Sequence, residues 1–201
     1  VRGTELDTYT KVTLVHELTH AWQDQHTNLG RLQDMTSSDE QAAFRAVVEG
    51  DADGAERAWV EQLSQAQQDA YDAQASAKSD QATKGMSSVP DVMVAAFSAP
   101  YAFGPSFVEG IDAQRGQPGV EAVLLDPPTG ERQLLEPWLF LAGKGAPVEV
   151  SLPGDDEGPD VVDSGSFGAV FAYLILAEQI DPQMALAATD VLAGDAYRAE
   201  K

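Results

Sequence analysis

His16-Glu17-Leu18-Thr19-His20 lies in a segment from about residue 8 to about residue 26 whose apolar residues have the spacing of an amphipathic helix. Asn28-Leu29-Gly30 follows as a stop signal. Residues four apart on a helix are separated by about 400° of rotation, so the two histidines project from one face, a single turn apart. Two imidazoles placed in this way can bind one metal ion. Glu17 borders the same face and can accept a proton from metal-bound water.

The third metal ligand that we expect is Glu49, on a second amphipathic helix from Ser38 to about Leu63. A catalytic zinc site normally has three protein ligands and leaves its fourth position to water. Asp53 lies one turn beyond Glu49 on the same face, where it can accept a hydrogen bond from the free ring nitrogen of His16. Gly50 would let the two helices approach closely. The alternative is that Glu49 and Asp53 belong to an exposed acidic helix face.

His26 is the rival third ligand, because it falls ten residues after His16, where the metzincin pattern has its third histidine. That pattern needs a glycine three residues after the second histidine to turn the chain back, and this chain has Gln23 there. If the helix continues, His26 lies about 120° round from His20 and points away from the ion. We therefore favour Glu49.

The composition limits both the metal ligands and the partners. The chain has no cysteine, so a metal must be held by imidazole and carboxylate groups, which zinc accepts. Its 12 Lys and Arg against 33 Asp and Glu give a formal net charge of -21, which disfavours nucleic acid and anionic membrane surfaces as partners. Self-repulsion that keeps the protein soluble explains this charge better than a dedicated cationic partner. No apolar run is long enough to span a membrane.

The length favours a single domain over residues 1–201. Ser38 and Gln41 form a capping-box pattern at the start of the second helix. The chain begins at Val1 rather than Met, so it could be a domain excised from a longer chain, and targeting segments could have been removed. The sequence leaves the location unknown, with an extracytoplasmic one favoured. Three further predictions concern helices before residue 130 and the strand after it. We expect a solvated helix extension and a mobile connection over 65–84, short helices interrupted at Pro100 and Pro105 over 90–125, and a strand over 146–152. After the strand we expect an acidic loop over 154–160 that is solvated rather than calcium-binding, an apolar helix over 167–180 and a shorter helix to about Leu192.

The motifs resemble those of the gluzincins, the thermolysin-like zinc peptidases, in which a distal glutamate is the third ligand and an aspartate supports a histidine. More closely, His16-Glu17-Leu18-Thr19-His20-Ala21-Trp22-Gln23-Asp24-Gln25-His26 and Val48-Glu49-Gly50-Asp51-Ala52 look like a bacterial metallopeptidase family, over roughly residues 12–53. The resemblance implies a mainly helical, zincin-like α+β fold with a small sheet and a site between the first two long helices. It also implies Zn2+ as the cofactor and a peptide or protein as the substrate, with endopeptidase activity. The residue roles that it implies are metal ligand for His16, His20 and Glu49, general base for Glu17, and hydrogen-bond acceptor for a ligand histidine for Asp53.

Two departures from the gluzincin pattern concern the substrate. These enzymes commonly stabilise the oxyanion with a histidine and a tyrosine, but the three histidines here all lie by position 26. Tyr101 is our first candidate for this donor and Arg115 the second, although either could be a packed or surface side chain. Zincins also resemble one another in an edge strand ahead of the active-site helix, and only Val1-Arg2-Gly3 would remain of it.

Two hypotheses about function follow. The first is a zinc-dependent peptidase with Glu17 as general base. The second is a catalytically inactive, zinc-stabilised binding or scaffold domain, which the uncertain oxyanion donor keeps open. A di-iron helical bundle is discarded, because it needs two Glu-x-x-His pairs and Glu17 to His20 supplies one.

Overall fold

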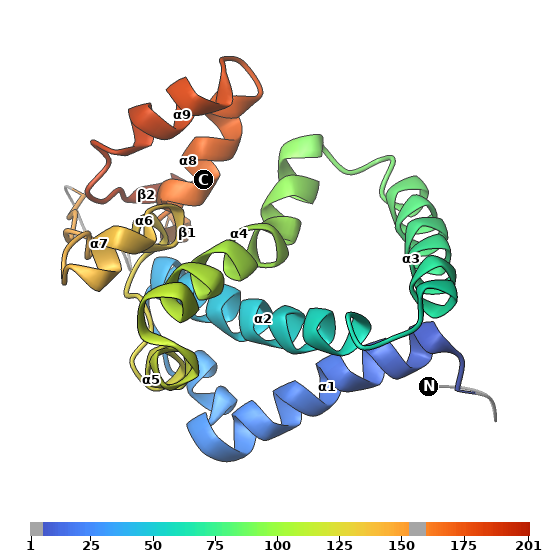
Figure 1. Cartoon of the computed structure of the whole chain (residues 1–201). Coiled ribbons are helices and arrows are strands. Elements are labelled where there is room, and N and C mark those ends of the chain that lie inside the picture. Colours follow the sequence, from blue (N-terminus) through green and yellow to red (C-terminus); the bar gives the residue numbers. More distant parts are fainter. Residues whose placement is uncertain (1–5, 153–159) are drawn as a thin grey trace.

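The chain folds mainly into helices, as predicted, in a computed structural model that describes residues 6–152 and 160–201 (Figure 1). The small sheet is also confirmed, as one antiparallel pair of strands in the C-terminal part. Val1-Arg2-Gly3 lies outside the described residues. The elements are α1 (Thr8–Thr27), the 3-10 helix η1 (Leu29–Gln33), α2 (Ser38–Val60), α3 (Gln65–Gly85), α4 (Asp91–Arg115), α5 (Gln117–Leu125), α6 (Glu131–Leu135), α7 (Pro137–Leu141), β1 (Val161–Gly165), α8 (Gly168–Ala177), α9 (Pro182–Thr189) and β2 (Tyr197–Glu200).

The first two helices begin at capping side chains. Asp7 accepts a hydrogen bond from Thr10 N at 2.8 Å at the start of α1. Helix α2 begins at Ser38 as predicted, but its cap is Ser37, whose side chain accepts from the amide of Glu40. The expected capping box is therefore wrong, because the Gln41 amide turns back to donate to the carbonyl of Met35 at 2.6 Å.

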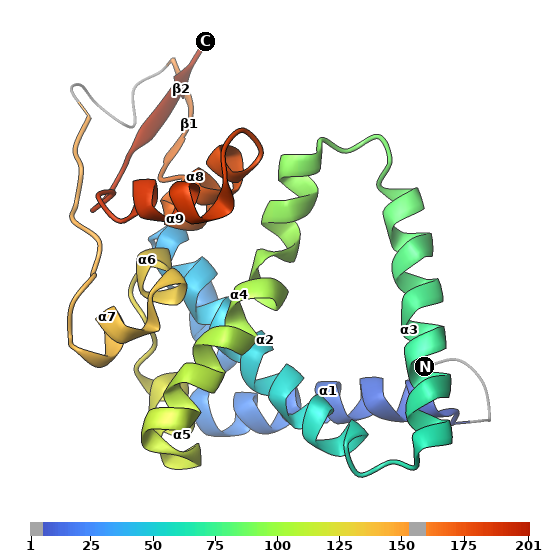
Figure 2. The ribbon, with the colours of Figure 1, turned by 45° about the horizontal axis from the view of Figure 1, so that its top comes forward.

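Helix α4 corrects the prediction of short helices over residues 90–125. It runs for 25 residues through both Pro100 and Pro105. Each proline removes one backbone hydrogen bond and bends a helix, but tertiary packing can hold the helix together. The C-terminal half of α4 supplies that packing, because Phe107 and Ile111 are buried against α2. The ribbon shows α4 changing direction along its length (Figures 1 and 2).

Two glycines allow α2 and α4 to cross in close contact. A Cβ atom at Gly50 would lie 2.4 Å from the backbone of Gly104, and one at Gly104 would lie 2.1 Å from the carbonyl oxygen of Ala46. Gly50 therefore brings α2 close to α4, not to α1 as predicted. Around this crossing lies the main core, formed by Ala43, Phe44, Ala46, Val47, Val48, Phe107, Val108, Ile111, Val120, Val123, Leu124 and Leu134.

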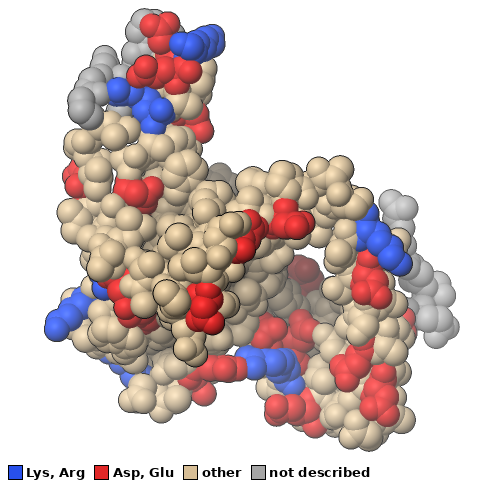
Figure 3. Space-filling model, turned by 90° about the horizontal axis from the view of Figure 1, so that it is seen from above, with Lys and Arg blue, Asp and Glu red and all other residues tan. Residues whose placement is uncertain are grey.

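Helix α3 is a separate helix and not the predicted extension of α2. Its N-cap is Ser64, which forms a capping box with Gln67. None of its residues is buried, as expected for a solvated helix, and it contacts α1 through the stacked rings of Tyr9 and Tyr71. Helix α3 and the N-terminal half of α4 project away from α1 and α2 in the ribbon (Figure 2), and the space-filling view is hollowed between α3 and α4 (Figure 3).

The C-terminal part contains one further correction. The predicted strand over 146–152 is not formed, because its residues 146–151 are all exposed and no strand pairs with them. Val148 N makes a single hydrogen bond of 2.7 Å to Ala193 O. Most of the predicted acidic loop, residues 154–159, lies outside the described residues. The predicted apolar helix over 167–180 is present as α8 and is three residues shorter at its end. No helix in the described ranges is long and apolar enough to cross a membrane.

Candidate metal centre

Three side chains from two helices converge where α1 packs on α2. His16 and His20 project from one face of α1, with their Nε2 atoms 3.0 Å apart. Glu49 of α2 places its Oε2 atom 3.3 Å from His16 Nε2 and 3.4 Å from His20 Nε2. Between 14% and 22% of each side chain is exposed, so the donors are shielded but reachable. In the part of the chain that the structure describes, this is the one group of histidines and acids that could hold a metal ion.

The triangle of donor atoms, with edges of 3.0, 3.3 and 3.4 Å, is close in size to one that a single metal ion can span. Zinc lies about 2.0–2.1 Å from nitrogen and oxygen ligands, so two corners of its tetrahedron are about 3.3–3.4 Å apart. Glu49 Oε2 is buried, and no described residue makes a hydrogen bond to it. A buried carboxylate oxygen that faces two imidazole nitrogens needs a cation or a proton between them. The residues present therefore fit a divalent metal.

The electrostatics of the centre keep its carboxylate ionised. Burial works to raise the pKa of Glu49, but the contacts and charges of His20 and His16 outweigh it, so this pKa lies below its usual value. Contact with the Glu49 carboxylate in turn raises the pKa of His20, against the burial that lowers it. An ionised carboxylate is the form that binds a metal.

Gln23, whose role in the site no sequence motif indicated, fixes the orientation of His20. It is completely buried, and its Nε2 donates to Val48 O at 3.0 Å and to Asp51 Oδ2 at 2.8 Å. Its Oε1 lies 2.8 Å from His20 Nδ1. Since the amide nitrogen is already committed, the amide oxygen accepts the Nδ1 proton, which leaves the lone pair of His20 Nε2 facing the centre.

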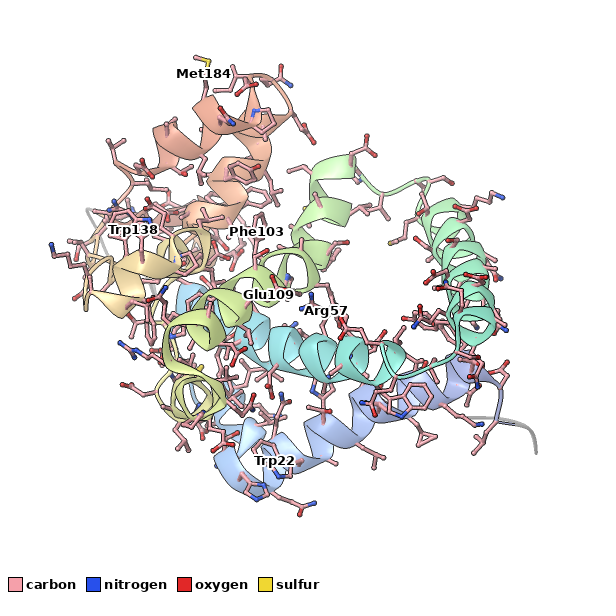
Figure 4. All side chains as sticks on the ribbon, in the orientation of Figure 1. Trp22, Arg57, Phe103, Glu109, Trp138 and Met184 are labelled. Carbon is pink, nitrogen blue, oxygen red and sulfur yellow. The ribbon has the colours of Figure 1, made fainter. Side chains whose placement is uncertain are left out.

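Glu56, and not Asp53, is the carboxylate beside His16. Glu56 Oε2 lies 3.3 Å from His16 Nδ1, whereas Asp53 Oδ2 forms an ion pair of 2.8 Å with Arg57 Nε. Residues seven apart on a helix differ by about 20° in direction and residues four apart by about 40°, so Glu56 follows Glu49 more closely along the face of α2. Asp53 is instead paired with Arg57, which also pairs with Glu109 of α4 (Figure 4).

His26, the rival third ligand, lies away from the centre. Helix α1 continues to Thr27 and ends where Asn28 adopts a left-handed conformation with φ of 55°. The exposed ring of His26 stacks on Trp22 with the centroids 4.3 Å apart, at the C-terminal end of α1 (Figure 4). His26 does not reach the centre because α1 continues past Gln23, the position at which the metzincin pattern has a glycine that turns the chain back.

Of the remaining candidates for chemistry, Tyr101 contacts the centre and Glu17 lies within electrostatic reach of it, whereas Arg115 is far from it. Tyr101 of α4 donates a hydrogen bond of 3.2 Å to Glu49 Oε1. Burial raises the pKa of Tyr101, and the charges of Glu49 and Glu17 add to this, so the exposed Glu17 lies within electrostatic reach of the tyrosine. Arg115 is 14 residues further along α4, about 20 Å away along the helix, and donates to the carbonyl of Leu141.

Two cavities flank the centre, and Tyr101 lines both of them. The larger, of about 350 Å³, lies beside His20 and Glu49, and the smaller, of about 270 Å³, lies beside His16. The other residues lining the larger cavity are Leu29, Leu32, Phe44, Arg45, Val48, Phe97 and Pro100, and those lining the smaller one are Tyr9, Val12, Thr13, Asp53, Glu56 and Tyr71. The donors thus lie between an apolar hollow and a more polar one.

Comparisons with known proteins do not place this geometry in a family. No protein-family profile matches the chain, and neither does any curated protein or solved structure. The resemblance to gluzincins therefore rests on the motifs alone.

Proposed function

We propose that the chain is a zinc-dependent peptidase with a zincin-like arrangement of its first two long helices. The observation that carries the proposal is the convergence of two imidazole Nε2 atoms and one carboxylate oxygen, with that oxygen buried and lacking a hydrogen-bond donor among the described residues. Two nitrogens and one oxygen form the ligand set of thermolysin-type zinc sites, which leaves one position for water or substrate. His16, His20 and Glu49 would hold the ion.

A zinc ion bound by these residues would lower the pKa of its water ligand to about 7 and would polarise the scissile carbonyl. Glu17 follows His16 on α1 and is exposed. In this proposal its carboxylate takes a proton from the attacking water and passes it to the leaving amine nitrogen. The water oxygen first bonds to the carbonyl carbon, and the π electrons of the C=O bond move to the carbonyl oxygen. When these electrons return, the carbon–nitrogen bond breaks and the nitrogen leaves with the proton from Glu17. Tyr101 turns its hydroxyl from Glu49 Oε1 to the carbonyl oxygen, where it donates a hydrogen bond as negative charge develops.

The direct test is Glu17→Gln, which keeps the shape of the side chain and removes the base. Because general base catalysis contributes at least about 100-fold, we expect cleavage of casein or of a peptide library to fall at least that far. Bound zinc, measured by elemental analysis, should be unchanged. Glu61→Gln, at an exposed position after the end of α2, is the matched control and should cleave like the wild type.

The outcomes separate the two hypotheses. Equal turnover by the wild type and Glu17→Gln would end the peptidase proposal. Zinc binding that raises thermal stability without cleavage by any variant would favour the zinc-stabilised binding or scaffold domain. A protein that binds no zinc would end both.

A further inference from the structure

The larger cavity beside the centre has mostly apolar walls and one cation. Its volume of about 350 Å³ is within the range of ligand pockets, roughly 300–1,000 Å³. Phe97 and Tyr101, four residues apart on α4, line it although their side chains are 69% and 59% exposed. Large aromatic side chains that remain exposed around an apolar hollow are typical of a surface that a ligand covers.

Arg45 is the cation in this cavity, and it differs from the other described arginines. It precedes Glu49 by four residues, so its side chain lies on the same face of α2, one turn from the metal ligand. It is exposed, and no described residue forms an ion pair or hydrogen bond with it. The other described arginines all have partners, which are backbone carbonyls for Arg31 and Arg115 and carboxylates for Arg57, Arg132 and Arg198.

The lack of a partner is informative because the chain is so acidic. With 33 acidic residues and a net charge of -21, a surface arginine has many carboxylates with which it could pair. A guanidinium group offers five N–H donors in a planar fork that matches the two oxygens of a carboxylate. An unpaired arginine beside an apolar cavity therefore provides the two features that recognise a large apolar side chain with a carboxylate next to it.

We propose that this cavity is a substrate subsite for a large apolar residue that is accompanied by a carboxylate, which Arg45 binds. As a substrate subsite the proposal rests on the peptidase function, although ligand binding itself does not require turnover. The carboxylate can be the free C-terminus of the apolar residue or the side chain of a following Asp or Glu. A free C-terminus would make the enzyme act near peptide ends, and an acidic side chain would direct it to internal sites.

The test is binding of small probes by isothermal titration calorimetry at low ionic strength, with zinc and again with EDTA. N-acetylphenylalanine carries a terminal carboxylate, N-acetylphenylalaninamide carries none, and N-acetylphenylalanyl-aspartamide carries a side-chain carboxylate. We expect one or both of the acids to bind about three- to fivefold more tightly than the amide, as for an exposed ion pair. N-acetylalanine should bind more weakly than N-acetylphenylalanine, because it leaves the apolar walls unfilled.

Variants assign the effect to Arg45. In Arg45→Gln the preference for the acids over the amide should disappear, while the preference for phenylalanine over alanine remains. Arg45→Lys should retain part of the preference for the acids. Arg115→Gln, which removes the same charge elsewhere on the surface, should behave like the wild type. Binding of acid and amide with equal affinity, or an acid preference that persists in Arg45→Gln, would overturn the assignment, whether or not the protein cleaves peptides.

Discussion

Gln23 shows how much of the candidate centre depends on a residue that does not touch the metal position. Its amide connects His20 on α1 to Val48 and Asp51 on α2, and it is completely buried. One side chain thus sets the tautomer of a ligand and joins the two helices that carry the donors. Supporting residues of this kind typically change metal affinity by 10- to 100-fold when they are removed.

Gln23→Ala tests this dual role. We expect zinc affinity, measured by competition with a chromophoric chelator, to fall about 10- to 100-fold, because the His20 ring is no longer fixed. The free energy of unfolding in urea should also fall by about 1–3 kcal/mol, since the carbonyl of Val48 and the carboxylate of Asp51 lose their donor. Gln25→Ala, an exposed position on the same helix, should change neither quantity. A Gln23→Ala protein with unchanged zinc affinity would contradict the role in orienting His20.

The support of His16 can be tested by comparing two carboxylates. Glu56 lies beside His16 Nδ1 and also accepts a hydrogen bond of 2.5 Å from Tyr71, whereas Asp53 pairs with Arg57. We therefore expect Glu56→Ala to weaken zinc binding by about tenfold or more and Asp53→Ala to have little effect. Chelator competition on the two variants, side by side, gives the answer. The reverse order of affinities would restore the role that the sequence motif suggested for Asp53.

At the scale of the elements, the two histidines could be placed from one helix and Glu49 from its motif, but the carboxylate beside His16 was predicted wrongly. The four-residue spacing places His16 and His20 on one face whatever α1 packs against. The choice between Asp53 and Glu56 depends instead on the angle at which α1 meets α2, which the sequence does not contain. Gly50 was correctly expected at a close helix contact, but its partner is α4 and not α1.

The corrections to the secondary structure have a similar cause. Pro100 and Pro105 are local signals of interruption, yet α4 continues because its C-terminal half is packed in the core. Residues 146–152 alternate like a strand, but a strand needs a neighbour, and residues 146–151 of this segment remain exposed with none. Local sequence patterns thus predicted where helices begin, but not the tertiary contacts that let a helix continue or leave a strand unformed.

The crossing of α2 and α4 gives a matched pair of glycine substitutions. Gly50→Ala should lower the free energy of unfolding by at least about 1–3 kcal/mol, the usual cost of overpacking a core. The reason is that the added methyl group would lie 2.4 Å from the backbone of Gly104. Gly54→Ala, one turn along the same helix with nothing within 4 Å, should raise it by about 0.5–1 kcal/mol through helix propensity. Urea unfolding of both variants measures the difference. Equal effects of the two substitutions would show that α2 and α4 are not in close contact.

At the scale of the whole molecule, α2 joins the candidate centre to the rest of the fold. It packs against α1 at the metal ligands, against α4 at the glycine crossing and against α5 and α6 in the core. Acidic side chains are spread over the face in Figure 3, and basic ones are few. In so acidic a chain, burial of a further carboxylate is unfavourable unless it takes up a proton.

Glu131 is such a buried carboxylate, and it joins α6 to the start of α8. Its Oε2 accepts a hydrogen bond of 2.8 Å from Val170 N, and Asp39 of α2 lies beside it, accepting from the Glu131 amide at 3.0 Å. Burial raises the pKa of Glu131 to about 8, the charges of Asp39 and Asp195 add to this, and the backbone hydrogen bonds only partly oppose it. Near neutral pH the side chain is therefore mostly protonated in the folded protein.

This proton makes stability depend on pH in a defined direction. Between pH 4.5, the usual pKa of the group, and about 8, the folded chain holds a proton that the unfolded chain has lost. The stabilising contribution is therefore complete below about pH 4.5 and is lost as the pH rises through about 8. Over the 2.5 units from pH 5.5 to 8 the change is on the order of 3 kcal/mol.

Glu131→Gln isolates this contribution, because an amide oxygen can still accept from Val170 N and carries no charge at any pH. We expect the free energy of unfolding of the wild type to fall more than that of Glu131→Gln between pH 5.5 and 8.5, at constant ionic strength. Carboxylates that do not interact with Glu131 affect both proteins equally, so the difference between the two slopes reports Glu131 together with its coupling to Asp39 and Asp195. Parallel pH profiles would mean that Glu131 is ionised throughout and that α8 is held to α6 by a charged group.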